Sequence, residues 1–87
     1  MYNFIVNPNA RSGLGKKVWN KLESILKAEK IDYRVYFTRY QKDATNITRE
    51  ITSSDEEHIV VALGGDGTVN EVVNGIVNFK NTILGYI

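Results

Sequence analysis

The sequence predicts an α/β fold, with a parallel sheet that carries helices on both faces in the order β-α-β-α-β-α-β. Short apolar stretches alternate along the chain with longer stretches of helical periodicity. The segment Ile59-Val60-Val61-Ala62 is an unbroken apolar run, typical of a strand buried on both faces of a parallel sheet. A glycine-rich turn follows it and leads into another helical pattern. Because the crossovers between parallel strands are right-handed, such alternation places helices on the two faces of one sheet.

The first strand and helix are marked by a proline and by apolar spacing. A strand is predicted at Phe4-Ile5-Val6, and Asn7-Pro8 ends it because proline has no backbone N–H for a strand ladder. Residues 9–15 then read as a polar loop. A helix is predicted from about residue 16 to residue 29. Its apolar face is predicted to consist of Val18, Leu22, Ile25 and Leu26, with Trp19 at the margin.

Alternation marks the second strand, at residues 33–37, which Thr38 closes. A second helix is predicted to begin near Asp43, a residue type that favours the N-cap, and to end before the polar segment 52–57. It is predicted to turn Ala44, Ile47 and Ile51 toward the core. His58 leads into the third strand and is interpreted as a strand-edge residue rather than a ligand.

The third helix follows the glycine-rich turn. The pattern Thr68-x-x-Glu71 predicts a capping box, which gives Glu71 a structural role, and Asn78 is predicted to end the helix. A last strand is predicted at residues 82–87. Because this strand is apolar to its final residue, we expect the chain to be a fragment of a longer protein.

Length and composition restrict the classes of protein. At 87 residues the chain is one compact unit, with 43% hydrophobic and 24% charged residues, as in ordinary globular proteins. A net charge of +1 argues against a nucleic-acid-binding protein. There is no cysteine, and neither a signal peptide nor an apolar run of membrane-spanning length is found. These features predict a cytoplasmic protein.

The glycine-rich turn is the strongest functional signal. We call residues 64–68, Gly-Gly-Asp-Gly-Thr, the glycine loop. Glycines between a strand and a helix let backbone N–H groups approach a phosphate, which the helix dipole also attracts; the alternative is a turn that only reverses the chain. The dinucleotide fingerprint does not fit, because its third glycine position holds Asn70, counting from Gly65. A Walker A match at residues 10–17 also fails, since it lacks the first glycine and the final hydroxyl.

Three loops follow the carboxyl ends of predicted strands. They are residues 7–15, which we call the first loop, residues 38–42, which we call the second loop, and the glycine loop. In open parallel sheets, ligands bind beyond these ends, where the strand order reverses. We therefore expect the three loops to converge on one site.

These motifs resemble those of a known family. The segments Asn7-Pro8-Asn9-Ala10 and Gly64-Gly65-Asp66-Gly67-Thr68-Val69-Asn70-Glu71-Val72, together with Thr38, look like the N-terminal part of the diacylglycerol kinase catalytic family, which includes bacterial lipid kinases and the sphingosine and ceramide kinases. The resemblance covers essentially the whole chain. NAD kinases share the glycine motif, but the Asn-Pro loop and the threonine favour lipid kinases. An NAD kinase fragment remains one alternative. A non-catalytic α/β module of receiver or flavodoxin type is another, weakened because the chain has no acidic cluster after the first strand.

The resemblance implies a lipid kinase that uses ATP and Mg²⁺ to phosphorylate a lipid hydroxyl, such as that of diacylglycerol. Residues 1–87 would be the N-terminal part of its ATP-binding domain, resembling the corresponding domain of NAD kinases as well. The family's second Gly-Thr-Gly motif, its β-rich lipid-binding domain and its carboxylate general base would lie beyond Ile87. The longer protein would touch a membrane surface transiently and be peripheral there, and the exposed sheet edge of this chain favours self-association.

The resemblance also implies a set of nucleotide-binding residues. They are Asn7, Pro8, Asn9, Ala10, Arg11, Thr38, Gly64, Gly65, Asp66, Gly67, Thr68, Val69, Asn70 and Glu71. Backbone N–H groups of Gly65, Gly67 and Thr68 would hold phosphate. Two roles stay open for Asp66, which would either act through Mg²⁺ or hold the loop. Arg11 and Lys16 would either neutralise phosphate or remain solvated. Many family members have glycine where Arg11 stands, and Ser12-Gly13 would supply that turn here.

Overall fold

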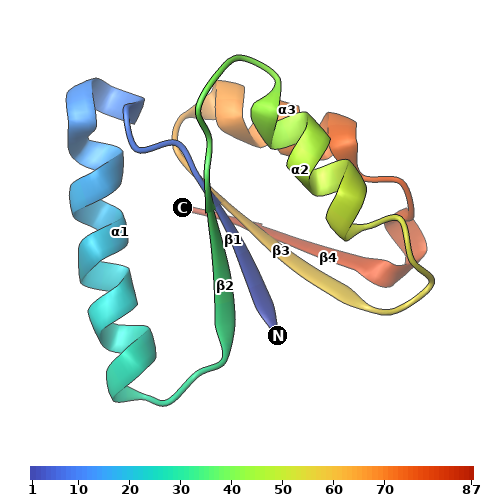
Figure 1. Ribbon diagram of the computed structural model, residues 1–87, viewed down its shortest axis with the longest axis horizontal. Coiled ribbons are helices and arrows are strands. Elements are labelled where there is room, and N and C mark those ends of the chain that lie inside the picture. Colours follow the sequence, from blue (N-terminus) through green and yellow to red (C-terminus); the bar gives the residue numbers. More distant parts are fainter.

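A four-stranded, all-parallel sheet with the strand order β2-β1-β3-β4 forms the centre of the computed structural model (Figure 1), which describes residues 1–87. The predicted α/β fold is confirmed. The elements are β1 (Tyr2–Val6), α1 (Ala10–Ala28), β2 (Tyr33–Phe37), α2 (Asp43–Ile51), β3 (His58–Leu63), α3 (Asp66–Gly75), the short 3₁₀ helix η1 (Phe79–Asn81) and β4 (Thr82–Tyr86).

The strand order places the reversal of chain direction beside β1. The chain moves from β1 to β2 in one direction and then crosses back over β1 to β3 and β4. Right-handed crossovers in opposite directions put α1 on one face of the sheet and α2 and α3 together on the other, as Figure 1 shows. Val6 pairs with both Phe37 and Leu63, so β1, β2 and β3 end level with one another. This register brings the three predicted loops to the same edge.

Large aromatic side chains fill the face under α1. Phe4, Trp19 and Leu26 are buried there with Val6 and Leu63. The ring of Trp19 lies 5.2 Å from that of Phe4 and 5.7 Å from that of Tyr33, between centroids.

Trp19 is therefore the centre of the α1 face, and its predicted place at the margin is wrong. Val18 and Ile25, predicted to face the core, are 40% and 58% exposed, whereas Trp19 is 1% exposed. The buried stripe runs through Gly15, Trp19, Leu22 and Leu26, because the helix is rotated toward the position where glycine lets it approach β1.

Small and polar side chains join the two helices of the opposite face. Ala44 of α2 and Val72 of α3 are buried against the sheet, with Ile47 and Ile51 half-buried beside them, as predicted. Thr45 Oγ1 donates a hydrogen bond to the carbonyl of Glu71, at 2.7 Å. Gly75 is packed so closely that an added Cβ would collide with the Thr45 carbonyl and lie 2.8 Å from the Cβ of Thr48. We call this contact, formed by Thr45, Thr48, Thr52, Glu71 and Gly75, the threonine–glycine seam.

Both predicted helix caps are wrong. α2 begins at Asp43, but Lys42 occupies the N-cap position, in a left-handed conformation, and no side chain caps the helix. α3 begins at Asp66, two residues before the predicted capping box, and its N-cap is Gly65 in an extended conformation without a side-chain bond. The chain leaves β3 through two glycines, so the helix starts as soon as they have turned it, and Thr68 is buried inside the first turn.

The end of α3 and the surroundings of His58 remain to be described. α3 ends at Gly75 rather than at Asn78, because Ile76 turns extended and becomes buried. His58 is a buried strand residue whose Nε2 lies 3.0 Å from Ser54 Oγ, in agreement with its predicted structural role. No helix combines the length and apolar character that a membrane span requires.

Candidate functional site at the carboxyl ends of the strands

The three loops lie together at the upper end of the sheet in Figure 1. Their residues border one cleft. Its volume is about 470 Å³. It lies where the strand order reverses between β1 and β3, the position at which open α/β sheets bind ligands. The residues that line it are Asn7, Asn9, Ala10, Arg11, Thr38, Arg39, Tyr40, Gln41, Ala44, Gly65, Gly67, Thr68 and Glu71.

The first loop is a compact turn fixed to the sheet. The Asn7 N–H donates to the carbonyl of Leu63, at 2.9 Å, and Asn7 Oδ1 accepts the N–H of Asn9, at 3.1 Å. Gly15 packs against the Asn7 carbonyl so tightly that a Cβ would overlap it. Residues 11–13 all have positive φ, from 54° to 95°, so the regular part of α1 starts only after them. Residues 11–13 of the predicted loop therefore form a left-handed turn, and α1 begins at Ala10 rather than near residue 16.

The glycine loop divides into a packed and an open part. A Cβ on Gly64 would meet Thr68, with 2.9 Å to its Cβ, so this glycine is required by the fold. A Cβ on Gly65 or Gly67 would meet nothing within 4 Å, so the open space beside these two glycines belongs to the cleft. The Thr68 N–H donates to the Gly65 carbonyl, at 3.0 Å. The N–H groups of Asp66 and Gly67 precede it and have no acceptor within the helix.

The second loop contributes three residues to the cleft besides the predicted Thr38. Arg39, Tyr40 and Gln41 line the cleft with it. The Thr38 N–H donates to the Val6 carbonyl, at 2.8 Å, which continues the pairing of β1 and β2 by one residue. The only signal in the sequence that these residues belong to the site is their position directly after a predicted strand, because ligands of parallel sheets bind at the carboxyl ends of the strands.

The predicted site residues fall into two groups. Nine of them line the cleft, as the lining set above shows. The other five, Pro8, Gly64, Asp66, Val69 and Asn70, do not. Lys16 is also absent from the lining, because its Nζ lies 4.3 Å from the ring centroid of Phe37, under α1.

The charged side chains that line the cleft are Arg11, Arg39 and Glu71. Two cations and one carboxylate favour an anionic ligand. No group of three or more histidine, cysteine, aspartate or glutamate side chains is arranged to hold a metal ion.

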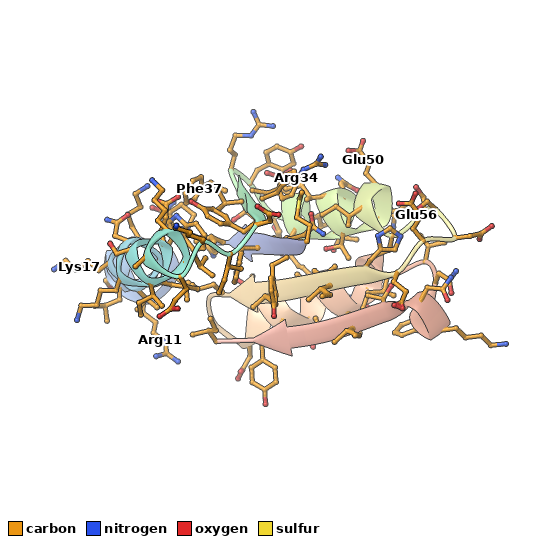
Figure 2. All side chains as sticks on the ribbon, turned by 90° about the horizontal axis from the view of Figure 1, so that it is seen from below. Arg11, Lys17, Arg34, Phe37, Glu50 and Glu56 are labelled. Atoms are coloured by element: carbon orange, nitrogen blue, oxygen red, sulfur yellow. The ribbon has the colours of Figure 1, made fainter.

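A second cleft, of about 570 Å³, lies at the amino ends of the strands. Arg34, Glu50 and Glu56 line it; in Figure 2 they lie around α2, away from Arg11 on the α1 side. It contains none of the predicted site residues. Although it is larger, the position rule for parallel sheets favours the cleft at the carboxyl ends.

Comparisons with known proteins agree with this geometry. The diacylglycerol kinase catalytic domain matches residues 1–87. A diacylglycerol kinase of Staphylococcus carnosus is 40% identical over 76 residues, which cover 83% of this chain and 23% of that protein. A ceramide kinase of Oryza sativa is 28% identical over 79 residues, 88% of this chain and 13% of that protein.

A solved structure of a diacylglycerol kinase from Bacillus anthracis superposes with a TM-score of 0.74 and 34% identity, covering 99% of this chain and 31% of that one. The chain thus spans less than a third of the proteins that it matches. The matches do not favour the NAD kinase or the non-catalytic module. The chain belongs to the diacylglycerol kinase catalytic domain family, a family of lipid kinases.

Proposed function

We propose that this chain is the N-terminal, nucleotide-binding part of an ATP-dependent lipid kinase. The enzyme would transfer the γ-phosphoryl group of ATP to a lipid hydroxyl, such as that of diacylglycerol. The observation that carries the proposal is the cleft at the strand-order reversal, which the open side of a glycine loop lines together with two arginines. Family membership supports the kinase chemistry and a nucleotide substrate.

In this proposal the glycine loop holds phosphate oxygens. The free N–H groups of Asp66 and Gly67 and the dipole of α3 favour negative charge at this position. The first loop and Thr38 would form the adjoining walls. Since phosphoryl transfer depends mainly on positioning and charge stabilisation, these groups would accelerate the reaction without forming covalent bonds.

Mg²⁺ fits as a partner of the nucleotide rather than as a resident metal. Mg²⁺ prefers oxygen ligands, and in kinases it commonly binds one or two carboxylates together with substrate phosphates. Glu71 is the carboxylate that lines the cleft, and Asp66 is exposed at the start of α3. Either would hold the ion, which would neutralise phosphate charge.

Substitutions in the glycine loop test the proposal. They are made in the natural protein that contains this chain, at its full length. We expect Gly65→Ala and Gly67→Val to abolish ATP-dependent phosphorylation of lipids in mixed micelles, because a Cβ would block the approach of phosphate. Neither Cβ meets a protein atom within 4 Å, so the fold should survive. Asp66→Ala should remove most of the activity.

Gly85→Ala is the matched control. Its Cβ would make only an ordinary contact with Val61, at 3.7 Å, and β4 contributes no residue to the cleft lining, so activity should persist. Full lipid phosphorylation by Gly65→Ala, Gly67→Val and Asp66→Ala alike would exclude the glycine loop as the site.

The 87-residue chain alone should not phosphorylate a lipid. It would provide one wall of the nucleotide site and none of the lipid site, so the ATP Kd should be about millimolar at best, or about 4 kcal/mol. Radiolabelled ATP with diacylglycerol or sphingosine micelles tests this, beside the longer polypeptide. Lipid phosphorylation by the chain alone would mean that the acceptor site lies within residues 1–87.

Brief contact with a membrane surface is expected only of the longer polypeptide, which must reach its lipid there.

A further inference from the structure

Three hydrogen bonds hold the backbone of the second loop. Its start is fixed by the hydrogen bond from Thr38 to β1, at 2.8 Å. Its end is a turn in which the Asp43 N–H donates to the Tyr40 carbonyl, at 3.1 Å, and Lys42 adopts φ 70° and ψ 1°. These angles are those of the third residue of a type II turn. Between the two ends, Asp43 Oδ2 accepts the N–H of Arg39, at 2.9 Å.

Asp43 is a buried carboxylate, only 3% exposed. A buried charge is unfavourable unless hydrogen bonds and an opposite charge compensate it. Here the compensation comes from a single residue: the Arg39 N–H and the Arg39 Nε, which lies 3.8 Å from Oδ2. The Asp43 carboxylate therefore interacts with Arg39 and with no other residue.

Arg39 is held at its inner end and free at its outer end. Its side chain is 79% exposed, and the guanidinium carbon lies 6.0 Å from the ring centroid of Tyr40. Asp43 contacts Nε, whereas the two Nη groups make no hydrogen bond within the chain. A guanidinium with two unused donor groups, beside a cleft, is suited to a phosphate.

The charges around the cleft indicate the kind of ligand. Arg11 and Arg39 come from different loops, and Glu71 is the sole acid among the lining residues. A nucleoside triphosphate carries several negative charges in a row, more than one helix N-terminus would neutralise. A second cationic group in the cleft lining, contributed by a different loop from Arg11, would meet that need.

We propose that Arg39 binds the polyphosphate of the nucleotide and that Asp43 is the positioning residue that orients it. This inference rests on the proposed nucleotide-binding function and adds two residues and a division of roles to it. Asp43 does not touch the ligand. It holds Nε and the Arg39 backbone, so that the Nη groups face the cleft when the nucleotide arrives.

The first test compares Arg39→Gln with Arg49→Gln in the longest natural polypeptide that contains this chain. Arg49 is an exposed arginine of α2 that bonds Asn46 Oδ1, at 3.3 Å, and does not line the cleft. Arg39→Gln should raise the KM for ATP about tenfold, the loss of one charge-assisted contact, with kcat changed less than about twofold. Arg49→Gln should change neither.

Binding of ATP, ADP and adenosine shows whether the lost contact is to phosphate. Arg39→Gln should weaken ATP and ADP by about tenfold and leave adenosine unchanged. Equal weakening of all three ligands, or no weakening, would overturn the assignment of Arg39. If the wild-type protein binds no ATP, the proposed function fails and this inference with it. If it binds ATP and Arg39→Gln binds it equally well, only this inference fails.

Asp43→Asn tests the positioning role. Asparagine keeps the size and an acceptor for the Arg39 N–H but removes the charge that faces Nε. The KM for ATP should rise about threefold, and no further rise should follow when Asp43→Asn is added to Arg39→Gln. Additive effects would show that Asp43 acts independently of Arg39.

Arg39→Lys tests the same role through the arginine and stands even if Asp43→Asn fails to fold. Lysine keeps the positive charge and has no Nε for Asp43 to hold. Its KM should lie between those of the wild type and Arg39→Gln. A KM equal to that of the wild type would show that charge alone suffices, and would overturn the positioning role.

Discussion

The two faces of the sheet are built from different kinds of side chain. Under α1, the large rings of Phe4, Trp19 and Tyr33 meet at centroid distances of 5.2 to 6.2 Å. On the other face, α2 and α3 meet through the threonine–glycine seam, where side chains are small and a hydroxyl reaches the backbone of the neighbouring helix. The face under α1 buries large apolar side chains, whereas the seam on the other face fixes the distance between α2 and α3.

The difference matters because of where the helices begin. α2 follows the second loop directly, and α3 follows the glycine loop directly. The distance between α2 and α3 therefore sets the distance between the second loop and the glycine loop, which both line the cleft. The α1 face supports the first loop but chiefly stabilises the sheet. We expect substitutions on the α1 face to change stability most, and substitutions in the seam to change stability less.

The largest effect should follow from Trp19→Ala. Removing this side chain, 1% exposed, should lower the free energy of unfolding by about 3–5 kcal/mol. Ile25→Ala, on the same helix but 58% exposed, should lower it by less than about 1 kcal/mol. Urea denaturation measures both losses. It is followed by circular dichroism rather than by tryptophan fluorescence, because Trp19 is the only tryptophan and Trp19→Ala removes it. Equal losses would mean that α1 is rotated relative to this description.

Gly75→Ala should have the next largest effect, because its Cβ would collide with the rigid carbonyl of Thr45. The expected loss is about 1–3 kcal/mol. Gly67→Ala, in the same helix, meets no atom within 4 Å and should leave stability unchanged or raise it by up to about 1 kcal/mol. Thermal unfolding of the pair separates steric packing from helix propensity. A similar change in both variants would contradict the seam.

Thr45→Val should cost about 1 kcal/mol, because it keeps the shape and removes the hydrogen bond to the Glu71 carbonyl. Ser24→Ala is the control on α1, where the exposed hydroxyl bonds the Asn20 carbonyl of its own helix, at 3.1 Å. It should change stability by less than about 0.5 kcal/mol. If Thr45→Val is as mild as Ser24→Ala in urea denaturation, the seam is not held by this bond.

The smallest effect should be a gain. Lys42 has φ 70°, where a side chain is strained, so Lys42→Gly should raise the free energy of unfolding by about 0.5–1 kcal/mol. Lys27→Gly, within the last turn of α1, should lower it by about 1 kcal/mol. Opposite signs in differential scanning calorimetry are the expected result, and a loss in both variants would contradict the left-handed turn before α2.

The sheet and its parallel order could be predicted because each strand has its own local signal. The run from Ile59 and the alternation from Tyr33 identify β3 and β2 without knowledge of their neighbours. The facing of α1 could not be predicted in the same way. Val18 and Trp19 are adjacent and both apolar, and only the close approach of Gly15 to β1 decides which of them is buried.

The site was predictable where glycine or proline marks it. Asn7-Pro8 and the glycine loop carry such marks, and both border the cleft. Arg39 and Tyr40 carry no such mark. Their position after a strand end was the only signal, and it is weak because arginine and tyrosine at a loop tip are common on any surface. Their place follows from Asp43, which turns its carboxylate back to the Arg39 N–H instead of capping α2. The sequence pattern of a helix start does not distinguish between these two uses of the carboxylate.

The most direct test of the account is an ATP titration of the uniformly ¹⁵N-labelled 87-residue chain, followed by the shifts of its backbone amide signals. The millimolar affinity expected of the isolated chain suits this measurement. We expect shifts confined to residues 7–13, 38–41 and 65–71, with Arg34 and His58 of the amino-end cleft unaffected. Shifts concentrated around Arg34, Glu50 and His58 would contradict the placement of the nucleotide at the carboxyl ends.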